Sequence, residues 1–125
     1  MARLKRFAIG AGLAGLFSFI LALITNVTEF PLLFASLASS IIIVFMKPGD
    51  DMSQPKSVVG SHLLAGLSGV TSIWITQGNL VLASALSLFI LILLMGVLGV
   101  FHPPAGGTAW SFALYPHSTE AMIGL

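Results

Sequence analysis

The fold is decided by the apolar run LVLASALSLFILILLMGVLGV at Leu80–Val100, together with the segment HPPAGGTA that follows it at His102–Ala109. The run has 21 residues, and a helix needs about 20 to cross the hydrocarbon core of a bilayer. Two prolines and two glycines then interrupt the backbone. Because lipid cannot satisfy free backbone polar groups, such a break has to be covered by protein or has to bind a solute.

Composition places the whole chain in a membrane. Of its 125 residues, 57% are hydrophobic and 7% are charged, so a soluble domain would lack polar surface to cover itself. The net charge of +1 gives no reason to expect a nucleic-acid partner. The absence of cysteine excludes disulfides, thiolate nucleophiles and cysteine metal sites. We therefore expect an integral membrane protein whose first partner is the lipid bilayer.

The apolar segments predict an all-α fold class, a polytopic transmembrane helix bundle that forms a single domain over residues 1–125. Four segments would cross the membrane, the second being short: 7–25, 31–45, 57–76 and 80–100. A cleavable signal peptide is the alternative for the first segment, although its apolar run is long and no small-residue cleavage site follows.

The positive charges predict the orientation. All five Lys and Arg residues precede the first span or lie between the second and third: Arg3, Lys5, Arg6, Lys47 and Lys56. The positive-inside rule then puts the N-terminus and the 46–56 loop in the cytoplasm.

The last segment is too short to cross as a helix. Residues 105–115 give 11 positions before Pro116, which is roughly half a membrane at 1.5 Å per residue. We predict a C-terminal re-entrant half-helix over about 103–115 that starts at its two prolines. Residues 121–125 resemble the start of a further segment, so we expect either a truncated chain or a helix supplied by a partner.

Two motifs carry a resemblance to a known family. Lys47-Pro48 with 53–62, followed by His102–Ala109, resembles the HPP family of small integral membrane proteins over roughly residues 34–109. Members from cyanobacteria and chloroplasts are associated with nitrite transport. The resemblance therefore implies transport of a small anion such as nitrite, in a plasma (inner) membrane or in a thylakoid or chloroplast envelope. Ala38-Ser39-Ser40 and Gly60-Ser61-His62 depart from the family's usual Gly-Ala-Ser and Gly-Gly-His.

The residues also suggest an inverted repeat. Segments 36–41 and 104–109 share small residues with a hydroxyl at the fifth place, Ser40 and Thr108. Two spans separate them, so their helices would start from opposite faces, as in transporters with broken helices. A plain helix-packing patch is the alternative.

A candidate anion site follows from the half-helix. The amides of Ala105, Gly106 and Gly107 would be free at the positive end of its dipole, and glycine allows close approach. The hydroxyls of Ser39, Ser40 and Thr108 are further candidate donors. The alternative is a tight turn at the membrane surface.

Ionisable residues near the spans are candidates for charge and proton coupling. His62 lies inside the third span, where an ionisable residue is a functional hypothesis, and either His62 or His102 could couple an anion to a proton. A neutral histidine bonded to a neighbouring helix is the alternative. Lys56 is either part of the site or an interface anchor. We expect no metal and no cofactor, because His62, His102 and His117 lie on separate segments without an acidic partner.

We predict a transporter or channel for a small inorganic anion. The small-residue helix faces predict a homo-oligomer. The alternative is an assembly or regulatory module that packs against a partner protein without transport. We do not expect an enzyme, because no nucleophile and base are paired and every acid lies in a loop or near a break: Glu29, Asp50, Asp51 and Glu120.

Overall fold

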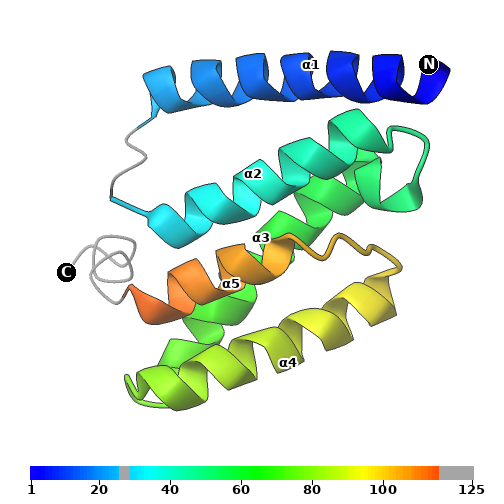
Figure 1. Cartoon of the computed structure of the whole chain (residues 1–125). Helices are drawn as coiled ribbons and strands as arrows, with labels where there is room; N and C mark the ends of the chain where they lie inside the picture. The colour runs from blue at the N-terminus through cyan, green and yellow to red at the C-terminus, as the bar shows by residue number, and fades with distance from the viewer. Residues whose placement is uncertain (26–28, 116–125) are drawn as a thin grey trace.

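The computed structural model describes residues 1–25 and 29–115 (Figure 1). This part of the chain is helical and contains no strand, which confirms the all-α fold class. Its elements are α1 (Ala2–Ile24), α2 (Pro31–Met46), the single 3-10 turn η1 (Asp51–Ser53), α3 (Pro55–Ile75), α4 (Leu80–Leu98) and α5 (Ala105–Leu114).

Three of these helices are long and apolar enough to cross a membrane, namely α1, α3 and α4, with 23, 21 and 19 residues. The shorter α2 has 16 residues, which span about 24 Å at 1.5 Å per residue. The first helix begins before the predicted residue 7, so the three basic residues near the N-terminus lie on its first turns.

Local sequence sets the helix ends. Pro31 and Pro55 occupy first-turn positions of α2 and α3, where a missing amide costs nothing. The side chain of Asn79 caps α4 by accepting a hydrogen bond from the Leu82 amide, 3.1 Å away. At the other end of α4, Gly99 adopts a left-handed φ of 67° and terminates the helix.

Small residues on α3 let α5 approach closely. A stripe of small residues at every fourth position of α3 is buried: Ser57, Ser61, Ala65 and Gly69. A Cβ at Gly69 would lie 2.6 Å from the Ala109 carbonyl oxygen, so the backbones of α3 and α5 touch there. Helices α2 and α4 pack against α5 on its other sides.

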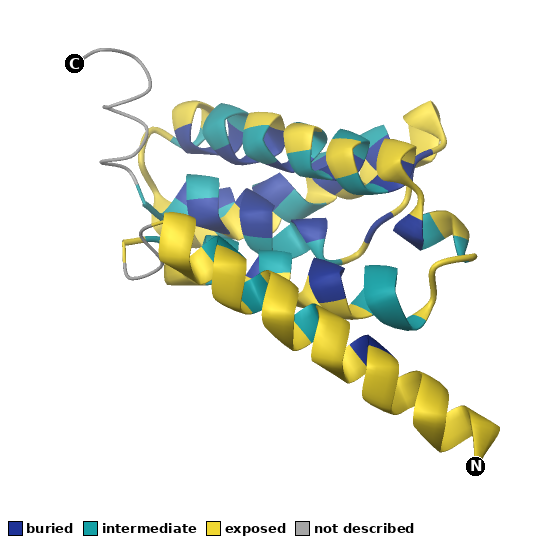
Figure 2. Cartoon of the chain, turned by 90° about the horizontal axis from the view of Figure 1, so that it is seen from above, coloured by how far each residue is buried: buried dark blue, intermediate teal, exposed yellow. Residues whose placement is uncertain are grey.

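Helix α1 lies at the edge of the bundle, beside α2 (Figure 1). Gly10 is its single buried residue, and Figure 2 shows the rest of the helix almost wholly exposed. The rings of Phe17 and Phe45 contact each other across the α1–α2 packing, 5.9 Å between centroids. In a bilayer the outer face of α1 is available to lipid or to another protein.

The predicted half-helix is α5, which runs antiparallel to α2 (Figure 1). Its C-terminal end reaches the start of α2, because the ring of Tyr115 lies 6.3 Å from that of Phe30. Residues 99–104 and α5 thus lead from the end of α4 back to the opposite end of the bundle. The predicted interruption at 116–120 and the segment 121–125 lie outside the described residues, as does any re-entrant turn.

Candidate functional site

Polar side chains from α2, α3 and α5 meet in the middle of the bundle. Ser36 and Ser40 lie one helical turn apart on the buried face of α2. His62 comes from α3, Thr108 from α5, and His102 from the segment before α5. Because His102 is 0% exposed, its polar atoms must find partners inside the protein.

The imidazole of His62 joins α3 to both neighbouring helices. Its Nε2 lies 2.9 Å from Ser40 Oγ on α2, and its Nδ1 lies 2.7 Å from Thr108 Oγ1 on α5. A neutral imidazole has one donor and one acceptor nitrogen, so it can donate to one of these hydroxyls while it accepts from the other.

His102 joins the same cluster through Ser40. Its Nδ1 lies 2.7 Å from the Met52 carbonyl oxygen, and its Nε2 lies 2.7 Å from Ser40 Oγ. Since a carbonyl oxygen only accepts, Nδ1 of His102 carries a proton. The rings of His62 and His102 are 5.4 Å apart between centroids, with Ser40 shared by both.

The remaining hydroxyls extend the cluster. Ser36 Oγ lies 2.9 Å from Thr108 Oγ1 and donates to the Pro104 carbonyl. A continuous series of hydrogen bonds therefore runs from one carbonyl to another. We call it the histidine network; in order, it consists of Met52 O, His102, Ser40, His62, Thr108, Ser36 and Pro104 O.

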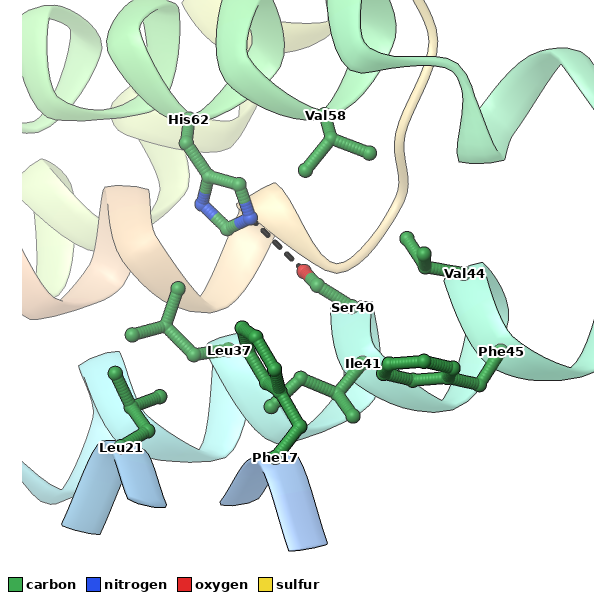
Figure 3. Close-up of a pocket in the computed structure, with 9 residues that line it drawn as sticks. All are labelled: Phe17, Leu21, Leu37, Ser40, Ile41, Val44, Phe45, Val58 and His62. Atoms are coloured by element: carbon green, nitrogen blue, oxygen red, sulfur yellow. Dashed lines mark hydrogen bonds between the residues drawn. The ribbon is translucent and has the colours of Figure 1, made fainter. Parts of the chain in front are cut away.

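A cavity of about 390 Å³ borders this network between α1, α2 and α3 (Figure 3). His62 and Ser40 belong to its lining, although the surface exposed to the cavity is apolar, and Figure 3 shows the imidazole directed at the hydroxyl. The other lining residues are apolar: Phe17, Leu21, Leu37, Ile41, Val44, Phe45 and Val58.

The structure brings four of the predicted site residues together and leaves two outside. The four are His62, His102, Ser40 and Thr108. Ser39 is exposed and donates to the Ala35 carbonyl of its own helix, 3.0 Å away. Lys56 is exposed on the first turn of α3, which agrees with the interface-anchor alternative.

The prediction of free amides at 105–107 is wrong. Each donates to a carbonyl three residues earlier: Ala105 to His102 at 3.1 Å, Gly106 to Pro103 at 3.0 Å and Gly107 to Pro104 at 3.2 Å. The carbonyls of residues 102–104 thus already accept from these amides, so the amides are not free to bind an anion. The glycines instead permit packing, because a Cβ at Gly107 would lie 2.8 Å from Ser36 Cβ.

Sequence reasoning missed three members of the network: the Ser36 hydroxyl and the carbonyls of Met52 and Pro104. Ser36 lies in the predicted repeat segment 36–41, and its place one turn before Ser40 on a polar face could have identified it. A backbone carbonyl leaves no such trace in a sequence. Within residues 1–25 and 29–115, no three His, Asp or Glu side chains gather as metal ligands would.

Comparison with known proteins identifies the family to which this chain belongs. A transmembrane protein of Dictyostelium discoideum is 31% identical over 84 residues, which cover 65% of this chain and 30% of that protein. The chain thus spans about a third of that relative's length. No solved structure matches. A family model described as "HPP, transmembrane region" matches residues 2–124, so this chain belongs to the HPP family of transmembrane proteins.

Proposed function

We propose that this protein moves a small inorganic anion across the membrane together with a proton, and that the histidine network is the site of both. The observation that carries the proposal is the sharing of Ser40 by two imidazoles beside a cavity between α1, α2 and α3 of a membrane protein. Ionisable side chains at such depth are costly, and they commonly mark proton relays and solute pathways.

The charge of the network favours an anion. A protonated imidazole in this site would be a buried cation, which is unfavourable unless a counter-charge accompanies it. No acidic side chain bonds to either imidazole among the described residues; their partners are hydroxyls and one carbonyl. A small anion bound beside His62 would supply the missing negative charge.

The apolar lining of the cavity favours movement of the anion with a proton. Seven of its nine lining residues are apolar, so a bare ion there would lose its hydration without compensation. Binding of the anion beside a protonated imidazole, or movement of the anion as its conjugate acid, keeps the pathway electrically neutral. The resemblance to members associated with nitrite transport makes nitrite the first anion to test.

The test is nitrite-driven proton entry into proteoliposomes that hold the full chain and a pH-sensitive dye. Nitrous acid itself crosses lipid. The signal is therefore the excess rate, which is the rate of internal acidification in proteoliposomes minus the rate in protein-free liposomes at pH 7.5. We expect faster internal acidification with the protein and a loss of the excess rate in His62→Gln. Lys56→Gln is the control, because Lys56 is exposed and outside the network. An excess rate that is absent in the wild type, or unchanged in His62→Gln, would contradict the proposal.

A second candidate function is an assembly or regulatory module, and the exposure of α1 favours it. Gly12 and Gly15 have open space where a Cβ would stand, so this helix presents a small-residue face that its own chain leaves uncovered. A folded protein without anion flux in the liposome test would favour this function over transport.

A further inference from the structure

The geometry points to a single proton-binding site shared by His62 and His102, with the Ser40 hydroxyl as the relay between them. The role of this proton in transport rests on the proposed function. The number of protons that the network holds follows from its hydrogen bonds alone.

The network is one proton short when both histidines are neutral. Six contacts connect the Met52 carbonyl to the Pro104 carbonyl, and each needs one proton. Two neutral imidazoles supply one N–H each, and the hydroxyls of Ser36, Ser40 and Thr108 supply one O–H each. Five protons therefore serve six contacts, and one pair of atoms meets without a proton between them.

One added proton completes every contact, and it does so in two ways. If His102 holds the charge, its Nε2 donates to Ser40, and the Ser40 hydroxyl donates to Nε2 of His62. If His62 holds the charge, its Nε2 donates to Ser40, and the Ser40 hydroxyl donates to Nε2 of His102. In each case Nδ1 of His62 donates to Thr108, which donates to Ser36, which donates to the Pro104 carbonyl.

The two arrangements interconvert by a balanced transfer of protons. The Nε2–H bond of His62 breaks as Ser40 Oγ gains that proton, and the original hydroxyl proton of Ser40 passes to Nε2 of His102. The positive charge moves from one ring to the other and no proton is lost. The distances of 2.9 and 2.7 Å at Ser40 Oγ are those of direct hydrogen bonds, so the relay needs no water.

The Ser40 hydroxyl has one competing acceptor, the Ser36 carbonyl, 3.0 Å away. That carbonyl also accepts the backbone amide of residue 40 within α2, so it does not depend on the hydroxyl. The hydroxyl is therefore available to the imidazoles.

The surroundings limit the site to one charge. A second proton would place two cations 5.4 Å apart between ring centroids, and their repulsion opposes it. Helices α2, α4 and α5 contain no titratable side chain, and α1 offers Phe17 and Leu21 to the cavity. Charged residues close in sequence to Met52 are Asp50, Asp51 and Lys56, of which Asp51 and Lys56 are exposed. The carboxylate of Asp50 accepts a hydrogen bond from the Met52 amide at 3.0 Å.

The test is a pH titration of the histidine side-chain nitrogens by NMR, with the 15N-histidine-labelled full chain in lipid nanodiscs. His117→Gln identifies the third histidine signal. We expect His62 and His102 to respond in one common transition, in which each ring reaches about half of the full imidazolium shift because the two titrate as a pair. If each ring reaches the full imidazolium shift over the same range, the shared site is wrong.

Variants at neighbouring serines separate the relay from general packing. Ser40→Ala removes the hydroxyl between the rings, so the common transition should split into two with different midpoints. Ser40→Thr keeps a hydroxyl and should restore the common transition, and Ser39→Ala is the matched control on the same helix. An unchanged common transition in Ser40→Ala overturns the relay. If Ser40→Ala does not fold, the titrations of the wild type and Ser40→Thr still decide the matter.

This experiment does not depend on transport. A common transition without anion flux would leave the shared proton in place and remove the proposed function. Anion flux together with two independently titrating imidazoles would support the proposed function and overturn the shared proton.

Discussion

The imidazole rings of His62 and His102 lie 5.4 Å apart between centroids, and both Nε2 atoms form a hydrogen bond with the hydroxyl of Ser40. One histidine comes from a spanning helix and the other from the proline segment before α5. This relationship connects the two halves of the HPP-family motif in space. It also explains why α2, α3 and α5 must pack closely, since each supplies a neighbour in the network.

The first prediction concerns pH. Protonation of the network supplies the positive charge that would attract an anion, so the KM for nitrite should fall as the pH falls. Burial lowers the pKa of His102, so the fall should come at a lower pH than the ordinary titration of histidine at about 6.5. The KM is measured from excess flux over protein-free liposomes. Lys56→Gln, whose side chain is exposed and lies outside the network, should keep the same dependence. A KM that rises on acidification would contradict the assigned charge.

The second prediction concerns packing of α3 against α5. A Cβ at Gly69 would lie 2.6 Å from Phe112 Cβ and from the Ala109 carbonyl oxygen, so Gly69→Ala should cost about 1–3 kcal/mol through overpacking. The measurement is the midpoint of thermal unfolding in detergent, followed by size-exclusion fluorescence. Gly96→Ala is the control, because no atom outside its two chain neighbours and the nearby backbone of its own helix lies within 4 Å of the added Cβ. Equal midpoints for the two variants would refute the close approach of α5.

The third prediction is the orientation in the membrane. The chain has no cysteine, so a single introduced thiol reports one position. Gly49→Cys lies in the exposed loop between α2 and α3 and should be labelled from the cytoplasmic side. Gln77→Cys, exposed at the other end of α3, should be labelled from the opposite side. Labelling in the reverse pattern would invert the orientation.

The fourth prediction is association of copies through α1. Ala11 and Gly15 are exposed at a spacing that lets two helices approach closely. Native mass spectrometry in mild detergent should show a homo-oligomer, and Gly15→Leu should shift it toward monomer. The conservative change Ile20→Leu on the same helix should have no effect. A wild-type protein that is monomeric yet transports nitrite would remove the oligomer from the account.

The sequence predicted the fold better than the site. Hydropathy and length located each helix, including the short α2 and the half-helix, because membrane spans are set by the thickness of the bilayer. His62, His102, Ser40 and Thr108 were identified from residue type and depth. Their mutual bonding was not, because it depends on how α2 and α5 pack.

The error at residues 105–107 has a physical cause. A helix N-terminus leaves its first amides unpaired on average, and the sequence alone offered no partner for them. The backbone turn at Pro103 and Pro104 turned out to provide acceptors. The carbonyl of Met52 was equally invisible, because any residue type could place an oxygen there.

The most direct test of the account compares two neighbouring hydroxyls on α2 in the nitrite-driven proton assay. Ser40 lies between the two imidazoles, whereas Ser39 is exposed and bonds within its own helix. We predict that Ser40→Ala lowers the excess flux at least roughly tenfold, which is equivalent to about 1.4 kcal/mol in the activation free energy. The excess flux of Ser39→Ala should stay within about twofold of the wild-type value, a change of about 0.4 kcal/mol. Equal flux in the two folded variants would contradict the account.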